Sequence, residues 1–158
     1  MPTYNNAGTL RNIVERVLTF CEDVVVVNDG STDASADILY SFGDKITIIS
    51  YEKNRGKGYA LKKGLEKARE LDFDYAITID TDGQHFPEDI PLFINALEQN
   101  PNFLIVGSRN LRQENMPGKN TFANKFSNFW FKVQTGVNLP DTQTGFRLYP
   151  LKKLPNLN

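Results

Sequence analysis

Two aspartates separated by one residue directly follow an apolar run and are the clearest candidates for metal chemistry in this sequence. Asp80 and Asp82 come after Ala76–Ile79, in the order Asp-Thr-Asp-Gly-Gln-His. In a strand they would share a face, and in a tight turn both can also reach one ion. Hard carboxylate oxygens suit Mg²⁺ or Mn²⁺, with a substrate diphosphate completing the octahedron. An ordinary Asp-Gly turn is the competing interpretation, and the position at a strand end favours the metal site.

Two further polar clusters follow apolar runs in the same way. Asn28–Asp33 comes directly after Val24–Val27, and Gly107–Arg109 comes directly after Leu104–Val106. Ligands of open parallel sheets bind at the carboxyl ends of the strands, so the three clusters are expected at one rim. Asp29 is placed there to accept a hydrogen bond from a base N–H or a ribose hydroxyl, although a helix-capping turn would also explain its cluster.

A glycine-rich basic loop and a single histidine complete the candidate chemistry. Asn54–Ala60 offers glycines that let backbone approach a ligand, with Arg55 and Lys57 adding positive charge at a helix start. The loop lacks the upstream glycine and the following Ser or Thr of a P-loop, and a simple helix-entry turn is an equal alternative. His85 is expected to be structural or exposed, rather than a base or ligand.

The elements that must position these residues alternate between strand and helix. Runs nearly continuous in Val and Ile predict parallel strands covered on both faces, over Val24–Asn28, Ile46–Ser50, Ala76–Asp80 and Leu104–Gly107. Helical spacing predicts helices over Leu10–Cys21 with Thr9 as cap, over Ala34–Phe42 after a Ser31 cap, over Tyr59–Leu71, and from Pro87 onward. This alternation predicts an α/β fold with a doubly wound, mostly parallel sheet and helices on both faces.

The pattern changes after Arg109. Asn110–Asn120 is polar and is expected to form a loop, and Phe122–Val133 then presents an aromatic helical face. That face suits either packing on the sheet or contact with a greasy acceptor or a membrane, and the spacing favours packing.

Composition excludes several classes of protein. The 158 residues suit one domain, 40% of them are hydrophobic, and the net charge of −1 gives no basic field for nucleic acid. Cys21 is the only cysteine, so no intrachain disulfide can form and a reducing compartment fits. No apolar run approaches the ~20 residues of a membrane-spanning helix, and the residues after Met1 lead us to expect no secretory signal. We expect a cytoplasmic protein, with the inner face of the membrane as an open alternative.

Taken together, these segments resemble glycosyltransferase family 2, the inverting enzymes of the GT-A fold. The resemblance covers nearly the whole chain and rests on the order and spacing of Pro2–Asn6, Val25–Asp33, Asn54–Gly64 and Asp80–His85. Two more segments, Gly107–Arg109 and Asp141–Arg147, are similar to motifs of the polyprenyl-phosphate branch, which includes dolichyl-phosphate mannose synthases.

The resemblance implies roles for individual residues. A GDP- or UDP-linked sugar would be bound by Pro2, Tyr4, Asn6, Asp29, Gly30, Lys57, Asp80, Thr81 and Asp82. Mg²⁺ or Mn²⁺ would be held by Asp80, Asp82 and Gln84, and the catalytic residues would be Asp82, Arg109, Asp141 and Arg147. The two arginines would face phosphates, and an ionised polyprenyl phosphate acceptor would need no strong protein base. For Arg147 and Asp141, a structural ion pair between them is the alternative to a catalytic role. A glycan acceptor and peripheral membrane contact also stay open.

The sequence departs from the family at both ends and at two positions. Asn6 stands where the family often has Glu, and Asn28 where it often has Asp. Residues 1–158 are expected to form a single but incomplete catalytic domain, without the central first strand and the C-terminal part. Five to eight further apolar residues before Pro2 are expected, and Leu151–Asn158 is expected to be a polar tail with nothing to pack against.

Two other functions compete with sugar transfer. A sugar-phosphate nucleotidyltransferase would share nucleotide binding, but its usual Gly-rich basic loop after the first strand is not found in Pro2–Thr9. A non-catalytic remnant that binds a nucleotide sugar is the other alternative, supported by the truncated appearance of both ends.

Overall fold

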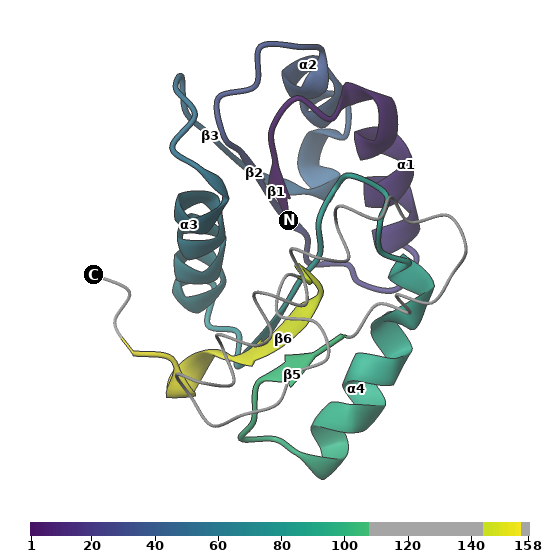
Figure 1. Ribbon diagram of the computed structural model, residues 1–158, viewed down its shortest axis with the longest axis vertical. Helices are drawn as coiled ribbons and strands as arrows, with labels where there is room; N and C mark the ends of the chain where they lie inside the picture. Colours follow the sequence, from purple (N-terminus) through teal and green to yellow (C-terminus); the bar gives the residue numbers. More distant parts are fainter. Residues whose placement is uncertain (108–143, 156–158) are drawn as a thin grey trace, which may run out of the picture.

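The computed structural model describes residues 1–107 and 144–155. Within these ranges, six strands form two three-stranded sheets, in the orders β1-β2-β3 and β4-β6-β5. Figure 1 shows α3 on one side of the strands, with α1 and α4 on the other side. The expected α/β architecture with helices on both faces is therefore confirmed.

The β1–β2–β3 sheet is entirely parallel and contains the first two expected strands. β2 (Val25–Asn28) pairs with β3 (Thr47–Ser50) in the register Val26↔Ile48. β3 is the edge strand, which is why it is half-buried instead of covered on both faces. β1 (Pro2–Thr3) pairs with the other edge of β2, so the segment expected to be only a loop begins with a strand.

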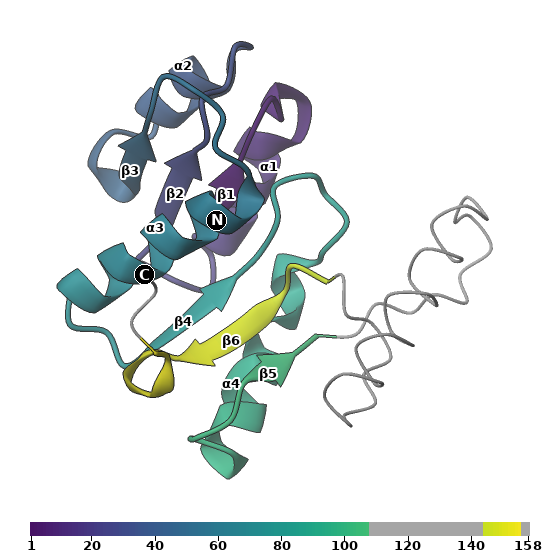
Figure 2. The ribbon, with the colours of Figure 1, turned by 60° about the vertical axis from the view of Figure 1, so that its left-hand side comes forward.

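The β4–β6–β5 sheet contains a second strand, β6, that periodicity did not predict, and its pairing is antiparallel where parallel strands were expected. β4 (Tyr75–Thr78) and β5 (Ile105–Val106) both pair antiparallel with β6 (Arg147–Pro150), which lies between them. Figure 2 shows this arrangement, with β6 returning alongside β4. A four-residue strand far along the chain from both partners carries too short a pattern to be recognised before its partners are known.

The four expected helices are present, but their starting points are built differently. They are α1 (Ala7–Val17), α2 (Ser35–Tyr40), α3 (Lys57–Glu70) and α4 (Ile90–Gln99). Pro87 begins the 3-10 turn η2 (Pro87–Asp89), three residues before α4, and a second such turn, η1 (Gly43–Lys45), precedes β3. The expected caps Thr9 and Ser31 were wrong: the helices start after Asn6 and Ala34, and both hydroxyls bond to other loops.

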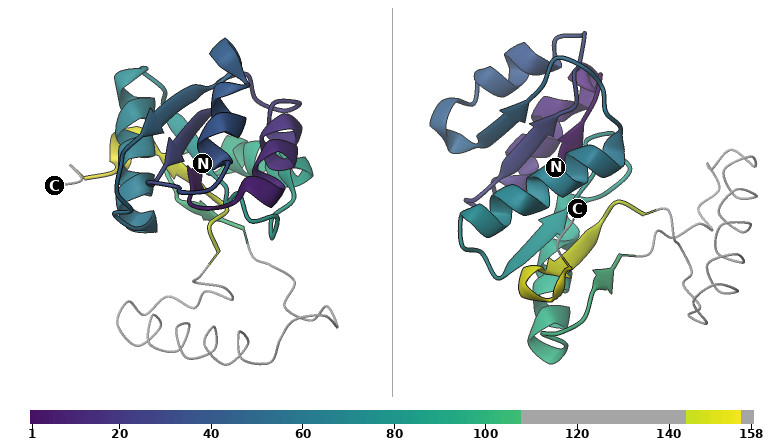
Figure 3. Two further views of the ribbon diagram at one scale, coloured as in Figure 1. Left: turned by 90° about the horizontal axis from the view of Figure 1, so that it is seen from above. Right: turned by 90° about the vertical axis from the view of Figure 1, so that its left-hand side faces the viewer.

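The larger of the two core clusters among the described residues connects the two sheets. α3 packs against β1, β2 and β4, and both sheets lie on the same side of it (Figure 3). The main cluster includes side chains from both sheets and from α1 and α4, such as Leu10, Val14, Val26, Ile79, Phe93, Phe146 and Leu148. No helix in the described ranges is long and apolar enough to cross a membrane.

The segment after β6 packs closely, contrary to the expectation of a tail without partners. Leu151 begins the 3-10 turn η3 (Leu151–Lys153), is fully buried, and forms a small cluster with Leu65 and Ala68 of α3. Arg69 donates hydrogen bonds from its guanidinium to the carbonyl oxygens of Leu151 and Leu154. The packing of this segment could not be predicted from its polar composition, because the Arg69 guanidinium bonds to backbone carbonyl oxygens, which every residue carries.

An apolar slot of about 280 Å³ separates β2 from β4. Its walls come from both sheets and from α3 and α4, and include Met1, Val25, Ala60, Leu65, Ile77, Ile79, Ile94, Leu97 and Leu148. The amino group of Met1 lies in this region and donates a hydrogen bond to the Val25 carbonyl oxygen at 2.8 Å. Burial lowers the pKa of this amine from 8.0 to about 5, and the nearby charge of Asp80 offsets only part of that effect.

We expect the stability of the 158-residue chain to rise with pH between about 5 and 8 because of this amine. In that window the unfolded chain binds a proton at Met1 and the folded chain does not, so folding is favoured as pH increases. The full difference amounts to roughly 4 kcal/mol at 1.36 kcal/mol per pKa unit. Urea titrations at pH 5, 6, 7 and 8 measure it, with the N-acetylated chain as control. If the free energy of unfolding changed equally with pH in the free and the N-acetylated chain, the amine would not be buried.

Candidate functional site

A pocket of about 330 Å³ opens where β1, β2 and β4 end. Its walls include eight of the nine residues proposed to bind a nucleotide sugar: Pro2, Tyr4, Asn6, Asp29, Lys57, Asp80, Thr81 and Asp82. Gly30, the ninth, does not line the pocket; its φ of 70° favours glycine, and the Lys53–Asn54 backbone leaves no room for a β-carbon. The apolar slot of about 280 Å³ is lined by none of the expected polar side chains, so the pocket at the strand ends is the candidate site.

Asp29 connects the end of β2 to the start of α3. It is 2% exposed, and its carboxylate accepts hydrogen bonds from the backbone N–H groups of Arg55 and Gly56 at 2.8 and 2.9 Å. Each carboxylate oxygen can accept a further bond from a ligand. Asp29 therefore has a structural role that the sequence did not reveal, because these partners are backbone groups 26 and 27 residues away.

The loop after β1 is held by the segment that follows β2. Asn5 has φ 53°, and its Oδ1 accepts a hydrogen bond from the backbone N–H of Thr32 at 2.8 Å. Its own N–H donates to Ser31 Oγ at 3.0 Å, and Asp33 Oδ2 accepts from the first N–H of α1, that of Ala7, at 3.0 Å. These bonds leave the Tyr4 side chain at the pocket, 45% exposed and available to stack on a flat ligand.

Thr81, the middle residue of the Asp-Thr-Asp segment, anchors that segment to β1. Its side chain is 1% exposed, and its hydroxyl accepts a hydrogen bond from Asn6 Nδ2 at 2.9 Å. The same hydroxyl lies 3.0 Å from Thr3 Oγ1 and 3.2 Å from the carbonyl oxygen of Pro2. Thr9 Oγ1 donates to the Thr81 carbonyl oxygen at 2.5 Å. The hydroxyls of Thr81 and Thr9 therefore attach the segment that carries the two aspartates to β1 and α1.

Replacing the Thr81 hydroxyl by a methyl group of equal size is expected to destabilise the fold. Thr81→Val leaves the Asn6 amide and the Thr3 hydroxyl without their buried partner, which costs about 1–3 kcal/mol. Urea denaturation measures this loss, and Thr81→Ser serves as the matched control because it keeps the hydroxyl. Equal stability of the Val and Ser variants would show that the network does not hold the segment in place.

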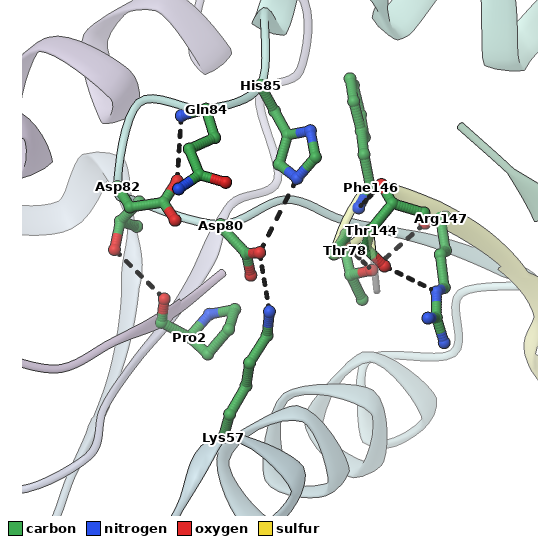
Figure 4. A network of polar contacts seen from close by, with 12 residues as sticks. Pro2, Lys57, Thr78, Asp80, Asp82, Gln84, His85, Thr144, Phe146 and Arg147 are labelled. Atoms are coloured by element: carbon green, nitrogen blue, oxygen red, sulfur yellow. Dashed lines mark hydrogen bonds and ion pairs between the residues drawn. The ribbon is translucent and has the colours of Figure 1, made fainter. Parts of the chain in front are cut away.

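The carboxylate of Asp80 is enclosed from three directions. Lys57 Nζ lies 2.7 Å from Asp80 Oδ2, and His85 Nε2 lies 3.7 Å from the same oxygen (Figure 4). A β-carbon on Gly145 would overlap this carboxylate, so only glycine fits there. Burial alone would raise the pKa of Asp80, but its contacts with His85 and Lys57 outweigh burial and bring the pKa below its usual range. Asp80 is thus held as an anion.

Asp82 and Gln84 lie at the exposed part of the same turn. The backbone N–H of Gln84 donates to Asp82 Oδ1 at 2.9 Å, which orients that carboxylate (Figure 4). Among the described residues no group of three or more His, Cys, Asp or Glu side chains converges to hold a metal. Asp80 and Asp82 nevertheless both line the pocket, and two carboxylates fit a hard divalent ion that takes its remaining ligands from a bound diphosphate. The donor set therefore suits Mg²⁺ or Mn²⁺ as an open site.

The second motif region approaches the site through β6. Thr78 Oγ1 of β4 donates to the Gly145 carbonyl oxygen at 2.8 Å, and Arg147 Nε donates to the Thr144 carbonyl oxygen at 2.9 Å. Arg147 is thereby placed two residues from the glycine that touches Asp80. Arg109 and Asp141 lie outside the described residues, as do the expected loop 110–120 and aromatic helix 122–133.

His85 is buried, as its structural interpretation allowed. It is 6% exposed, and its ring packs at 5.5 Å between centroids against Phe146, which in turn contacts Phe93 of α4 at 4.3 Å. These contacts connect the Asp80 turn to the segment that precedes β6.

The comparison with known families assigns the chain to a family. A family described as Glycosyl transferase family 2 matches residues 1–156. The chain belongs to this family. Membership in this family supports a transferase activity, and it favours sugar transfer over nucleotidyl transfer.

Individual relatives of this glycosyl transferase support the assignment. The chain is 30% identical over 177 residues to a UDP-N-acetylglucosamine–dolichyl-phosphate N-acetylglucosaminyltransferase of Methanococcus voltae, covering 100% of this chain and 70% of the relative. It is 26% identical to a polyprenol monophosphomannose synthase of Mycolicibacterium smegmatis, covering 100% and 63%. The chain thus spans roughly two thirds of these proteins, and about half of some others.

A solved structure confirms the fold. Glucosyl-3-phosphoglycerate synthase of Mycobacterium tuberculosis superimposes with a TM-score of 0.73 at 17% identity, covering 96% of this chain and 55% of that one. At this identity the likeness concerns the architecture, which is the GT-A fold that the resemblance implied.

Proposed function

We propose that this glycosyl transferase moves a sugar, with inversion, from a nucleoside diphosphate donor to a polyprenyl phosphate. The observation that carries the proposal is the pocket at the strand ends, which places a stacking Tyr4, a buried Asp29 and the Asp80–Asp82 pair around one volume. A flat base, a ribose and a charged diphosphate require these three kinds of group.

The nucleoside and diphosphate would occupy different parts of the pocket. Tyr4 and Asp29 would contact the base and ribose, since both lie where β1 and β2 end. Asp80, Asp82 and Gln84 would hold Mg²⁺ or Mn²⁺, which when bound would neutralise charge developing on the departing diphosphate. Lys57, at the first turn of α3, brings a cation to the same place.

The acceptor proposal rests on the relatives and on Arg147. Both curated relatives above carry dolichyl phosphate or polyprenol in their names. The phosphate of such an acceptor is ionised at neutral pH and can attack without a strong protein base. Arg147, beside Gly145, would orient that phosphate, and Arg109 and Asp141 remain proposed partners in this step. A permanent, forked charge such as guanidinium suits a phosphate.

Radiolabelled sugar transfer tests the function. UDP- and GDP-linked sugars are incubated with Mn²⁺ and a short-chain polyprenyl phosphate in detergent, and label is counted in the organic phase. Extractable label that disappears when the phosphate is replaced by the free polyprenol supports the proposal. Donor binding by calorimetry with no transfer to any lipid would instead identify a protein that only binds nucleotide sugars.

Arg147→Ala is expected to impair use of the acceptor and to leave donor binding near normal. Loss of a charge-assisted contact worth about 1.5–3 kcal/mol predicts a roughly 10- to 100-fold fall in kcat/KM for the polyprenyl phosphate. Calorimetry with the nucleoside diphosphate provides the internal control. An equal loss of donor affinity would place Arg147 at the donor and remove its acceptor role.

A further inference from the structure

Lys57 carries an ammonium group from the start of α3 to the carboxylate of Asp80. It is the first residue of α3 and follows Gly56, whose φ of 90° turns the chain into the helix. The carboxylate of Asp29 binds the N–H groups of Arg55 and Gly56, so the start of α3 is attached to the end of β2. From this anchored start the Lys57 side chain crosses the pocket to Asp80 (Figure 4).

Asp80 has one accessible side, and Lys57 lies on it. The Asp80 side chain is 15% exposed, with Gly145 and His85 against its oxygens. The Lys57 side chain is 51% exposed and lines the same pocket as Asp82. An ammonium 2.7 Å from Oδ2 therefore stands where a divalent ion would approach the carboxylate.

We propose that Lys57 is the counter-cation of Asp80 in the empty site, and that it couples metal binding to diphosphate binding. This inference rests on the proposed function of the pocket as a metal–diphosphate site. Two cations on one face of a carboxylate repel each other, so Lys57 must leave Asp80 when a divalent ion binds. Without a diphosphate, the other carboxylates of the pocket are Asp82, which the ion would also bind, and Asp29, which already accepts two backbone N–H groups, so displacing the ammonium weakens binding of the metal alone.

A diphosphate changes this balance. It brings negative charge into the pocket, to which the displaced ammonium can turn without leaving the first turn of α3. Metal and diphosphate then bind together more tightly than the product of their separate affinities, which is a coupling between two ligands. Lys57 thus disfavours a metal-loaded site without donor and favours one that holds both.

The test separates binding of the metal alone from binding of the metal with nucleotide. Free Mn²⁺ is counted by electron paramagnetic resonance during titration, first without nucleotide and then with saturating UDP or GDP. Lys57→Met is expected to bind Mn²⁺ alone about five- to tenfold more tightly, and Mn²⁺ with nucleoside diphosphate more weakly by a similar factor. Lys57→Arg keeps the charge and should restore the parent pattern.

Lys62→Met is the matched control because it removes the same charge from the same helix. Lys62 pairs with Glu66 at 3.8 Å and does not line the pocket. The coupling role would be overturned, and the metal site left intact, if Lys57→Met and Lys62→Met gave the same Mn²⁺ titrations. It would also be overturned if Lys57→Met bound Mn²⁺ more weakly both with and without nucleotide. A parent protein that binds no Mn²⁺ even with nucleotide would overturn the proposed function itself.

Discussion

Asp82→Asn is expected to weaken Mn²⁺-dependent binding of a nucleoside diphosphate by about 10- to 100-fold, without lowering the thermal midpoint. The loss corresponds to a charge-assisted interaction of about 1.5–3 kcal/mol. The fold should survive because Asp82 is exposed and the amide oxygen of Asn can still accept the Gln84 N–H. Calorimetry with Mn²⁺ and with a chelator measures the metal-dependent part of the affinity.

Asp89→Asn provides the control for this substitution. Asp89 is an exposed carboxylate at the end of η2, seven residues after Asp82, and it does not line the pocket. It should show the metal dependence of the parent. If Asp82→Asn also keeps the parent's metal dependence, the assignment of Asp80 and Asp82 to a divalent ion is wrong.

A strand added ahead of Met1 is expected to raise the thermal midpoint substantially. We propose that the slot between β2 and β4 holds such a strand, because β1 has only two residues and the free edge of β4 pairs with no strand in the described ranges. Phe20, Phe73 and Ile94 line the slot and are each more than a third exposed. An apolar strand continuing β1 would cover them.

The size of the effect follows from the volume of the slot. At about 24 cal/mol per Å³, filling 280 Å³ corresponds to roughly 6–7 kcal/mol as an upper value. A third of this would raise the midpoint by roughly 4–9 °C. The extension would also replace the buried amine by a peptide N–H.

The comparison uses three chains: the 158-residue chain, one extended by five to eight apolar residues, and one extended by the same number of Gly and Ser residues. Thermal midpoints and size-exclusion profiles are measured for each. The apolar extension should be the most stable and monomeric. Equal midpoints for all three, with the 158-residue chain monomeric, would show that the slot needs no strand, and the expectation of an incomplete domain would fail with it.

Local patterns in the sequence were sufficient for the α/β class and the polar clusters. Val25–Asn28 and Tyr75–Thr78 are rich in β-branched and aromatic side chains, and each cluster follows its strand within a few residues. Because parallel strands end at one rim, the convergence of Asp29, Asp80 and Asp82 on one pocket could be expected from order alone.

The tertiary structure decided the contacts between groups that are far apart in the chain. Asp29 accepts a hydrogen bond from a backbone group, the N–H of Gly56. The contacts of Thr81 with Asn6 and Thr3 depend on a single hydroxyl. Gly145 can lie against Asp80 because glycine has no side chain. None of these leaves a periodic or compositional signal, because a backbone N–H is common to all residues but proline. The sequence therefore determined which residues gather at the site, and only the fold determined which of them hold the others in place.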